Sequence, residues 1–427
     1  MQCEIASATI VVPHGRNRAG DVRAVLHHIV RTDGTADKRI GEGCVVGNIF
    51  RSGEDDAVRR THHPRCRGRQ ANKKVVAEEE YLSESNAMNK SLPIYLALSN
   101  AVLVKSNGER LAQDELLKLW NFLNLLIGSS CSRFIMRGES DENLVAQYGY
   151  GVETPDLLAQ SLFMAGEKGR ICWNDRRFLA PDDTSADNFK EICRTLARHI
   201  EEGCRGNSSR SVKIREFRSR NEEFCSAFGD IDRLVGIYAN LSKKERETVN
   251  LYYLSVAHTI NSIGYKKVSS FVSTTTDAQK AKDFTDDAII YGWVPRRMMS
   301  ISSAVRSGTI DYVVADKKPF IKRTGLPCCD SPVYPEQKEV SMRCGLLPHF
   351  IIGFKVGRNF YVNPGIFESM DRMVTMESWR KLAAFKRRLI NQGLEIDQTD
   401  FEEFCRKTNY RRYYTFDGYE YELHSLY

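Results

Sequence analysis

The sequence lacks the features of membrane-spanning and secreted proteins. It has no run of eighteen or more apolar residues, the length that a membrane-spanning helix needs. Its first twenty residues, MQCEIASATIVVPHGRNRAG, do not combine a basic start with an apolar core, as secretory signals do. The sequence therefore predicts a protein that neither contacts a membrane nor is classically secreted.

Cysteines with redox-motif or zinc-site spacing are also missing. The twelve cysteines include no CxxC, and only Cys328 and Cys329 are adjacent. With 427 residues and 42% hydrophobic side chains, the chain can bury one large core or two smaller ones without disulfides. We therefore expect a folded, reduced, cytoplasmic protein.

Positive charge is concentrated near the start of the chain. Residues 1–74 hold 14 Lys and Arg against 8 Asp and Glu. Residues 75–427 hold the other 48 Lys and Arg against 47 Asp and Glu, so most of the net charge of +7 comes from the first 74 residues. Net charge alone therefore does not predict nucleic-acid binding by residues 75–427.

Residues 1–87 form a predicted basic, weakly folded N-terminal extension, because no stretch there keeps a helical or strand period for long. Translation from Met88, the next methionine after Met1, is the alternative. A basic arm is one role for the extension. His62, His63 and Cys66 suggest a metal site, but no fourth ligand has suitable spacing, so no metal is predicted.

Apolar periodicity beyond residue 87 predicts an α+β fold. We expect a helical lead-in over 88–130 with a helix at 114–127, a strand at 133–137 ended by Gly138, and a helical insertion over about 155–262. Period-two patterns at 268–273, 288–294 and 350–356 predict a half-buried sheet. Residues 366–427 should supply a helix at 379–389 and a hairpin around Asp417-Gly418.

Three short segments carry groups suited to chemistry. Arg137 ends an apolar strand and is followed by Gly138; it is either a solvated strand end or a fork for a diphosphate. Ser273, Thr274 and Thr275 belong to a strand that precedes a helix, with an unusual density of hydroxyls. Glu339 opens a later strand after a Pro-flanked loop that contains Tyr334 and Gln337.

Taken in order, these segments resemble the ADP-ribosyltransferase family of the Arg–Ser–Glu type, over about residues 131–365. The resemblance implies an ADP-ribosyltransferase-like split β-sheet core with a large helical insertion, flanking helices and NAD as co-substrate. It assigns NAD binding to Arg137, Gly138, Ser273, Thr274 and Thr275, and catalysis to Glu339, Gln337 and Ser273. Tyr334 and Gln337 would face the acceptor.

The chemistry implied is cleavage of NAD at the nicotinamide–ribose bond through an oxocarbenium-like state, which a carboxylate such as Glu339 stabilises. In the family, Glu in place of Gln337 accompanies arginine modification, so we expect a non-arginine acceptor on a protein or nucleic acid. Such enzymes are often toxins or phage-defence effectors, which implies an antitoxin or immunity partner.

Several alternatives stay open at this stage. Arg215, Arg218 and Arg220 compete with Arg137 for the family's arginine. The segment Arg137-Gly138-Glu139-Ser140-Asp141, with Ala146-Gln147-Tyr148-Gly149 and the stretch from Thr154, also resembles an FRG domain. A noncatalytic FRG-like module that binds nucleic acid or protein, or an NAD glycohydrolase, would fit the same residues. Phe271, Tyr291 and Phe284 are interpreted as core, and His258 as a structural histidine.

Overall fold

A computed structural model describes most of the chain beyond residue 92. The described residues are 93–129, 132–167, 179, 181–260, 269, 271–295, 299–302, 305–306, 309–310, 318–343, 345–396, 403, 406, 412–416 and 421–425. The predicted extension, Met88 and the candidate metal ligands His62, His63 and Cys66 lie outside them.

The main sheet has eight strands, in the order β1-β10-β9-β4-β2-β3-β8-β5. β1 and β10 pair in parallel, and the other neighbours pair antiparallel. The bounds are β1 Val102–Val104, β2 Ser132–Glu139, β3 Phe271–Thr275, β4 Ala288–Pro295, β5 Met299–Ser302, β8 Glu339–Arg343, β9 Ile351–Val356 and β10 Asn359–Val362. This mixed sheet with many helices confirms the predicted α+β class.

The sheet nearly divides between β2 and β3. β2 pairs with β4 along its whole length, from Ser132 opposite Pro295 to Glu139 opposite Ala288. In contrast, β2 pairs with β3 only at Met136 and Thr275 among the described residues. Thr275 is the last residue of β3, and residues 137–139 of β2 have no described ladder partner in β3, so the strands diverge beyond Met136 and leave room for side chains between them.

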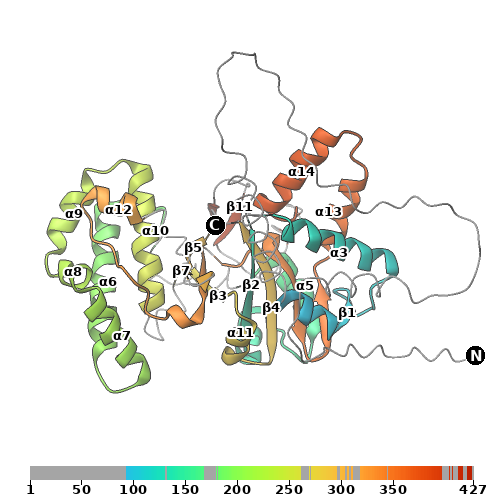
Figure 1. The fold of residues 1–427 in the computed structure, drawn as a ribbon, viewed down its shortest axis with the longest axis horizontal. Helices are drawn as coiled ribbons and strands as arrows, with labels where there is room; N and C mark the ends of the chain where they lie inside the picture. Colours follow the sequence, from blue (N-terminus) through green and yellow to red (C-terminus); the bar gives the residue numbers. More distant parts are fainter. Residues whose placement is uncertain are drawn as a thin grey trace, which may run out of the picture. The chain divides into compact units, whose positions relative to one another are not determined.

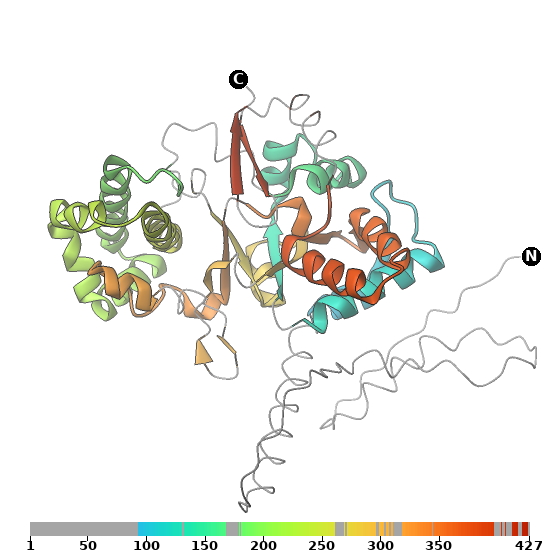
Figure 2. The ribbon, with the colours of Figure 1, turned by 90° about the horizontal axis from the view of Figure 1, so that it is seen from above.

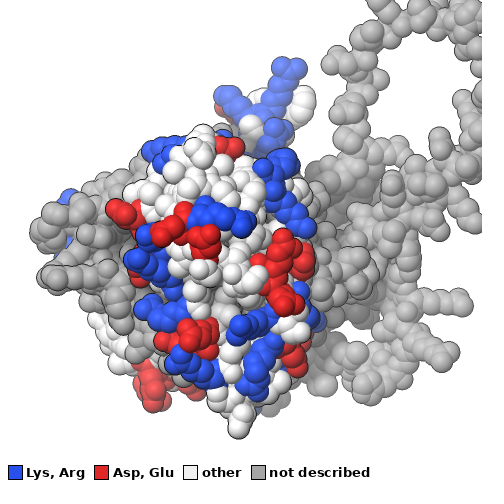
Figure 3. Space-filling view, turned by 90° about the vertical axis from the view of Figure 1, so that its left-hand side faces the viewer, with Lys and Arg blue, Asp and Glu red and all other residues white. Residues whose placement is uncertain are grey.

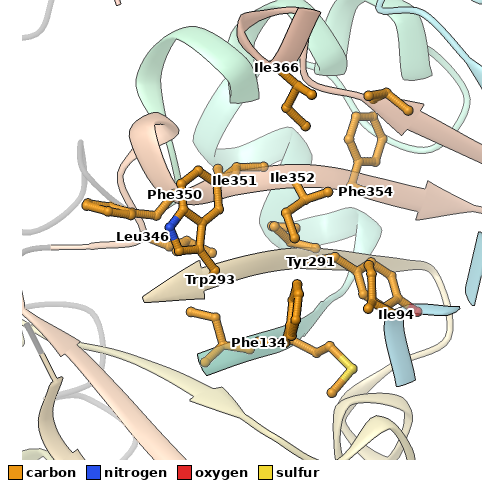
Figure 4. Packing of buried hydrophobic residues seen from close by; sticks show 14 of the residues in the cluster. Ile94, Phe134, Tyr291, Trp293, Leu346, Phe350, Ile351, Ile352, Phe354 and Ile366 are labelled. Carbon is orange, nitrogen blue, oxygen red and sulfur yellow. The ribbon is translucent and has the colours of Figure 1, made fainter. Parts of the chain in front are cut away.

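The first apolar core lies around β4 and β9. Trp293 of β4 packs edge-on against Phe350, and Ile351, Ile352 and Phe354 of β9 continue the same cluster (Figure 4). All eight residues of β4 are buried. The prediction of a half-buried sheet was therefore wrong for this strand, because helices and neighbouring segments cover both of its faces.

The helices that supply apolar residues to this sheet core include α3 Gln113–Ile127, α5 Pro155–Ala165, α13 Gly365–Val374 and α14 Trp379–Gln392. Figure 1 shows α3, α13 and α14 on one side of the strands. α3 begins after Ala112, whose backbone N–H donates to Glu115, and buries Leu119, Phe122, Leu123 and Leu126 at helical spacing. The predicted helices at 114–127 and 379–389 are both confirmed.

A second apolar core belongs to the later helices between β2 and β3, from α6 onward, and to α12. They are α6 Ala186–Cys204, α7 Ser209–Arg220, α8 Glu222–Ser226, α9 Ile231–Ala239, α10 Lys243–Ile260 and α12 Lys318–Thr324. Phe189 stacks on Tyr238 with ring centroids 4.0 Å apart. These helices gather on the opposite side of the strands from α3 (Figures 1 and 2).

Strand β3 joins the two cores. Phe271 belongs to the helical core, whereas the next residue, Val272, belongs to the sheet core. Successive side chains of a strand point to opposite faces, so Ser273 lies on the same face as Phe271. The predicted hydroxyl strand is therefore confirmed as a strand, and its serine faces the helical side.

Two details of the remaining elements bear on the sequence predictions. β2 continues through Gly138 to Glu139, so the prediction that Gly138 ends this strand was wrong. The C-terminal hairpin is confirmed by β11 Arg412–Phe416 and β12 Tyr421–Ser425, which pair antiparallel.

No helix in the described part of the chain combines the length and apolar character needed to cross a bilayer. On the described face shown in Figure 3, Lys and Arg alternate with Asp and Glu. That face therefore presents no extended patch of one sign.

Candidate active site

A pocket opens where β2 and β3 diverge. It is lined by residues of β2, β3, α11 (Ala278–Phe284) and the turn before β8: Met136, Arg137, Gly138, Ser273, Thr274, Thr275, Phe284, Gln337 and Glu339. The structure thus brings Arg137, Ser273 and Glu339, from three distant segments, to one place.

Arg137 bridges the gap between the diverging strands. Its Nη1 donates to the backbone oxygen of Ser273 at 2.7 Å, its Nη2 pairs with Glu139, and its Nε lies 3.1 Å from Glu167 Oε1. A strand that leaves its neighbour loses ladder partners, and the guanidinium supplies one for Ser273. Burial opposes the charge, but the two carboxylates outweigh burial and raise the pKa of Arg137.

This geometry makes Arg137 a positioning group for β3. Three sides of its guanidinium already face protein oxygens, and two carboxylates balance its charge. Contact between Arg137 and an NAD phosphate or ribose stays a prediction. The competing Arg215 and Arg220 donate to backbone oxygens of Cys204, Gly206, Glu216 and Pro332. Neither they nor Arg218 lines the pocket.

Gly138 allows α11 to approach β2. A Cβ at this position would collide with the backbone oxygen of Ala281, a fully buried residue of α11. Only glycine permits so close a backbone contact. Gly138 therefore sets the wall of the pocket, and its predicted contact with NAD stays a prediction.

Among the three predicted strand hydroxyls, only that of Ser273 bonds to another side chain in the site. The Thr274 hydroxyl donates to the backbone oxygen of Val340 at 2.6 Å. The Thr275 hydroxyl donates to the backbone oxygen of Gln337 at 2.9 Å and accepts from the backbone N–H of Asp277. The two threonines therefore hold β3 against β8 and against the turn that precedes it.

Glu339 opens β8, as the sequence predicts, and is 7% exposed. Lys338, just before it, has a φ of 48°, which is uncommon for a residue with a side chain and recurs at functional sites. Lys338 Nζ lies 2.7 Å from Asp277 Oδ2, and the Ser341 hydroxyl donates to Glu339 Oε1 at 3.0 Å. Glu339 is therefore a buried carboxylate held by its own strand.

Gln337 ends a short 3-10 helix, Pro335–Gln337, and lines the pocket. Tyr334 does not line it: its ring packs on the helical core, and burial raises the pKa of Tyr334. A contact between the acceptor and either residue stays a prediction.

His258, which the sequence suggested was purely structural, reaches the site from α10. Its Nε2 lies 2.8 Å from the Ser273 hydroxyl and 3.6 Å from Glu339 Oε1, and its Nδ1 lies 2.7 Å from the Ser269 hydroxyl. Helical periodicity marks His258 as buried but gives no sign of the strand that it contacts. Local sequence gives no sign of Glu167 either, because its place depends on two backbone hydrogen bonds with Leu346.

Phe284 was predicted to be core, and this prediction was wrong. It is 57% exposed and lines the pocket, whereas Phe271 and Tyr291 are buried as predicted. α11 has only seven residues and ends at Phe284, so the helix buries Ala281 but leaves the final ring at the pocket edge.

The segments that resemble an FRG domain pack against the same site. Glu139 accepts a bond from Asn143 of α4 (Asp141–Tyr148), which Ser140 caps. The Tyr148 hydroxyl donates to the backbone oxygen of Gly166, the residue before Glu167. The two resemblances therefore converge on the surroundings of Arg137.

Carboxylates dominate the charge around the pocket. Glu139, Glu167 and Glu339 are each less than 10% exposed, and Arg137 pairs with the first two. Such surroundings favour a ligand part that is positively charged or becomes so. Among the described residues, no group of His, Cys, Asp and Glu could hold a metal ion.

No protein-family model, curated protein or solved structure matches this chain.

Proposed function

We propose that this protein is an NAD-dependent ADP-ribosyltransferase. The observation that carries the proposal is the meeting of Arg137, Ser273 and Glu339 at one pocket, although Arg137 and Ser273 are 136 residues apart. The sequence resemblance requires this juxtaposition, and the adjacent strands β2, β3 and β8 supply it.

The charge of the pocket fits the reacting end of NAD. The nicotinamide ring of NAD is a cation, and the ribose carbon becomes positive as the glycosidic bond breaks. Glu339 stands ready to stabilise that charge and to accept a bond from a ribose hydroxyl, while the Ser273 hydroxyl offers a second polar contact. The diphosphate would lie outside this carboxylate-rich part of the site.

The bond changes are simple and need no group beyond the two substrates. The bond between ribose C1′ and the nicotinamide nitrogen breaks, its electron pair stays on nicotinamide, and the acceptor atom bonds to C1′ and loses a proton. Phe284 offers an exposed ring on which an aromatic base can stack. Gln337, at the pocket and close in sequence to Glu339, offers an amide to a non-arginine acceptor on a protein or nucleic acid.

The test is nicotinamide release from NAD by the purified full-length chain. Glu339→Gln should lower the rate by a factor on the order of 100 or more, since it removes the charge that faces the transition state. The variant should still fold, because an amide oxygen can accept from Ser341 as the carboxylate does. Glu336→Gln is the matched control: Glu336 lies in the same turn, is exposed and pairs with Lys213 at 3.7 Å.

The products separate the remaining alternatives. NAD labelled in its adenylate half should leave label on protein or nucleic acid if the reaction is transfer. Release of nicotinamide with free ADP-ribose alone would favour an NAD glycohydrolase. Equal turnover by Glu339→Gln would contradict the assignment of Glu339, and binding of a partner without any NAD cleavage would favour the noncatalytic FRG-like module.

A further inference from the structure

His258, on helix α10, contacts the Ser273 side chain from the side of the helical core. His258 is 3% exposed, and its ring lies beside Phe271 with centroids 5.8 Å apart. The two ring nitrogens lie 2.7 Å from the Ser269 hydroxyl and 2.8 Å from the Ser273 hydroxyl. A residue of the helical core therefore contacts a hydroxyl that lines the pocket.

The surrounding groups favour a hydrogen on Nε2 of the His258 ring. The backbone N–H of Phe271 donates to Ser269 Oγ at 3.2 Å, so the Ser269 hydroxyl already accepts one bond and can donate its own hydrogen to His258 Nδ1. In neutral imidazole one nitrogen accepts and the other donates. Nε2 is then the donor, and the carboxylate of Glu339 at 3.6 Å favours an N–H there.

This arrangement fixes the direction of the Ser273 hydroxyl. A serine on a strand can adopt three staggered side-chain rotamers. A hydrogen bond from the His258 N–H holds the Ser273 side chain in one of these rotamers. Because Ser273 Oγ is then the acceptor of that bond, the hydroxyl hydrogen of Ser273 can be donated into the pocket. The same nitrogen lies 3.6 Å from Glu339 Oε1, beyond hydrogen-bond distance, so its hydrogen bond in the site is to Ser273.

We propose that His258 is a positioning residue that orients Ser273 as a hydrogen-bond donor beside Glu339, and that it makes turnover depend on the helical core. This inference rests on the proposed NAD cleavage. His258 acts through Ser273, so its effect should disappear when the Ser273 hydroxyl is absent.

The test is a double-mutant cycle on nicotinamide release by the full-length chain. His258→Phe keeps an aromatic ring but removes both bonds, and it should lower kcat about 10- to 100-fold with little change in KM, because misplacement of a reacting group by about 1 Å has effects of this size. In a Ser273→Ala background the same change should have no further effect. His258→Gln, which retains an N–H donor, should restore part of the loss.

His199→Phe is the matched control, since His199 is also 3% exposed in the helical core but lies on α6 and outside the pocket. It should leave kcat unchanged. If His258→Phe does not fold, Ser269→Ala provides the second route: it removes the partner of Nδ1 and should lower kcat only when Ser273 is present.

The outcomes separate this inference from the proposed function. No nicotinamide release by the unmodified chain would overturn both. An active chain in which His258→Phe keeps its kcat, or loses as much in the Ser273→Ala background as without it, would overturn only the role of His258. Nitrogen NMR of the imidazole ring, with His258→Gln to identify the signal, should show the hydrogen on Nε2; a hydrogen on Nδ1 alone would refute the donor role without any activity measurement.

Discussion

The helical core and the region around β2, β3 and β8 bury different kinds of polar groups. Within residues 186–260, the buried polar side chains of the structure are neutral types: Thr195, His199, Ser211, Asn221, Asn250, Ser255 and His258. In and beside the three strands they include Arg133, Glu139, Glu167 and Glu339, which carry charge. A buried charge is far more costly than a buried amide, even when it has partners.

The difference teaches where function is to be sought. Asn221 serves the helical core by accepting from the backbone N–H groups of Asp330 and Ser331, a task that a neutral amide performs well. Three carboxylates beside one guanidinium at a strand gap are a costly arrangement for a purely structural role. Apart from His258, we therefore expect losses from the first set to affect stability alone and losses from the second set to affect chemistry as well. The following predictions test that division.

The largest effect is expected at Arg137. Arg137→Met removes the cation between Glu139 and Glu167 and leaves two buried carboxylates facing each other, which should lower the free energy of unfolding by about 3–5 kcal/mol. Denaturant unfolding monitored by circular dichroism measures this loss. Combining Arg137→Met with Glu167→Gln should recover part of it, because the second change removes one of the stranded charges.

If Arg137→Met leaves the free energy of unfolding unchanged, the guanidinium is not needed for the fold, and ligand binding is then its only proposed role. The comparison with Arg215→Met sharpens this result. Arg215 is exposed and donates only to backbone oxygens of Cys204 and Gly206 within the helical region, so its loss should matter much less.

The next effect is a pH dependence that belongs to the helical core. Burial, aided by the positive charge of Arg198, lowers the pKa of His199 to about 4, from 6.5. The unfolded chain therefore takes up a proton at a higher pH than the folded chain, so stability is lost as the pH falls from about 6.5 to 4 and changes little below that. The loss is about 3 kcal/mol at most.

Urea unfolding at a series of pH values, compared between the unmodified chain and His199→Phe, isolates this contribution. The difference between the two should be constant above pH 7 and should shift in favour of His199→Phe as the pH falls toward 4. A constant difference over the whole range would contradict the assignment to His199.

A smaller loss is expected from a neutral amide of the helical core. Asn250 is fully buried, and its Nδ2 donates to the backbone oxygens of Pro181 at 3.1 Å and Asp183 at 2.8 Å. Asn250→Ala leaves both oxygens without this donor and should cost about 1–3 kcal/mol in unfolding. Turnover per folded molecule should stay the same, in contrast to Glu339→Gln; a fall in kcat would break the proposed division between the two regions.

The sequence predicted the elements better than their meeting points. The strand that contains Ser273, the strand that begins at Glu339 and the helix at 114–127 follow from local periodicity, which the structure preserves. Even the fully buried β4 was found as a strand, although its two covered faces depend on helices far away in the chain.

The surroundings of Arg137 show why the rest of the site could not be predicted. Glu139 lies two residues after it, and strand alternation places both on one face, so this pair could have been found from the sequence. Glu167 reaches the site because its backbone pairs with Leu346, a contact between distant segments that leaves no local pattern. His258 is only 15 residues before Ser273, but their contact depends on how α10 packs against β3, which helical periodicity does not reveal.

The smallest stability effect is expected at Phe284, where the comparison is sharpest. Spacing from Ala281 suggested a buried ring, but 57% exposure means that Phe284→Ala should change the free energy of unfolding by about 0.5 kcal/mol or less.

If the ring of Phe284 stacks on a base of NAD, the same change should weaken binding by about 1–3 kcal/mol and raise KM roughly tenfold, with kcat little altered. Phe284→Tyr should behave as the unmodified chain does, while Val374→Ala, at an exposed site on α13, should leave both quantities unchanged. If Phe284→Ala alters KM but not stability, the ring contacts the ligand. If it alters stability alone, the ring contributes to the core, and no other aromatic side chain is found among the described residues that line the pocket.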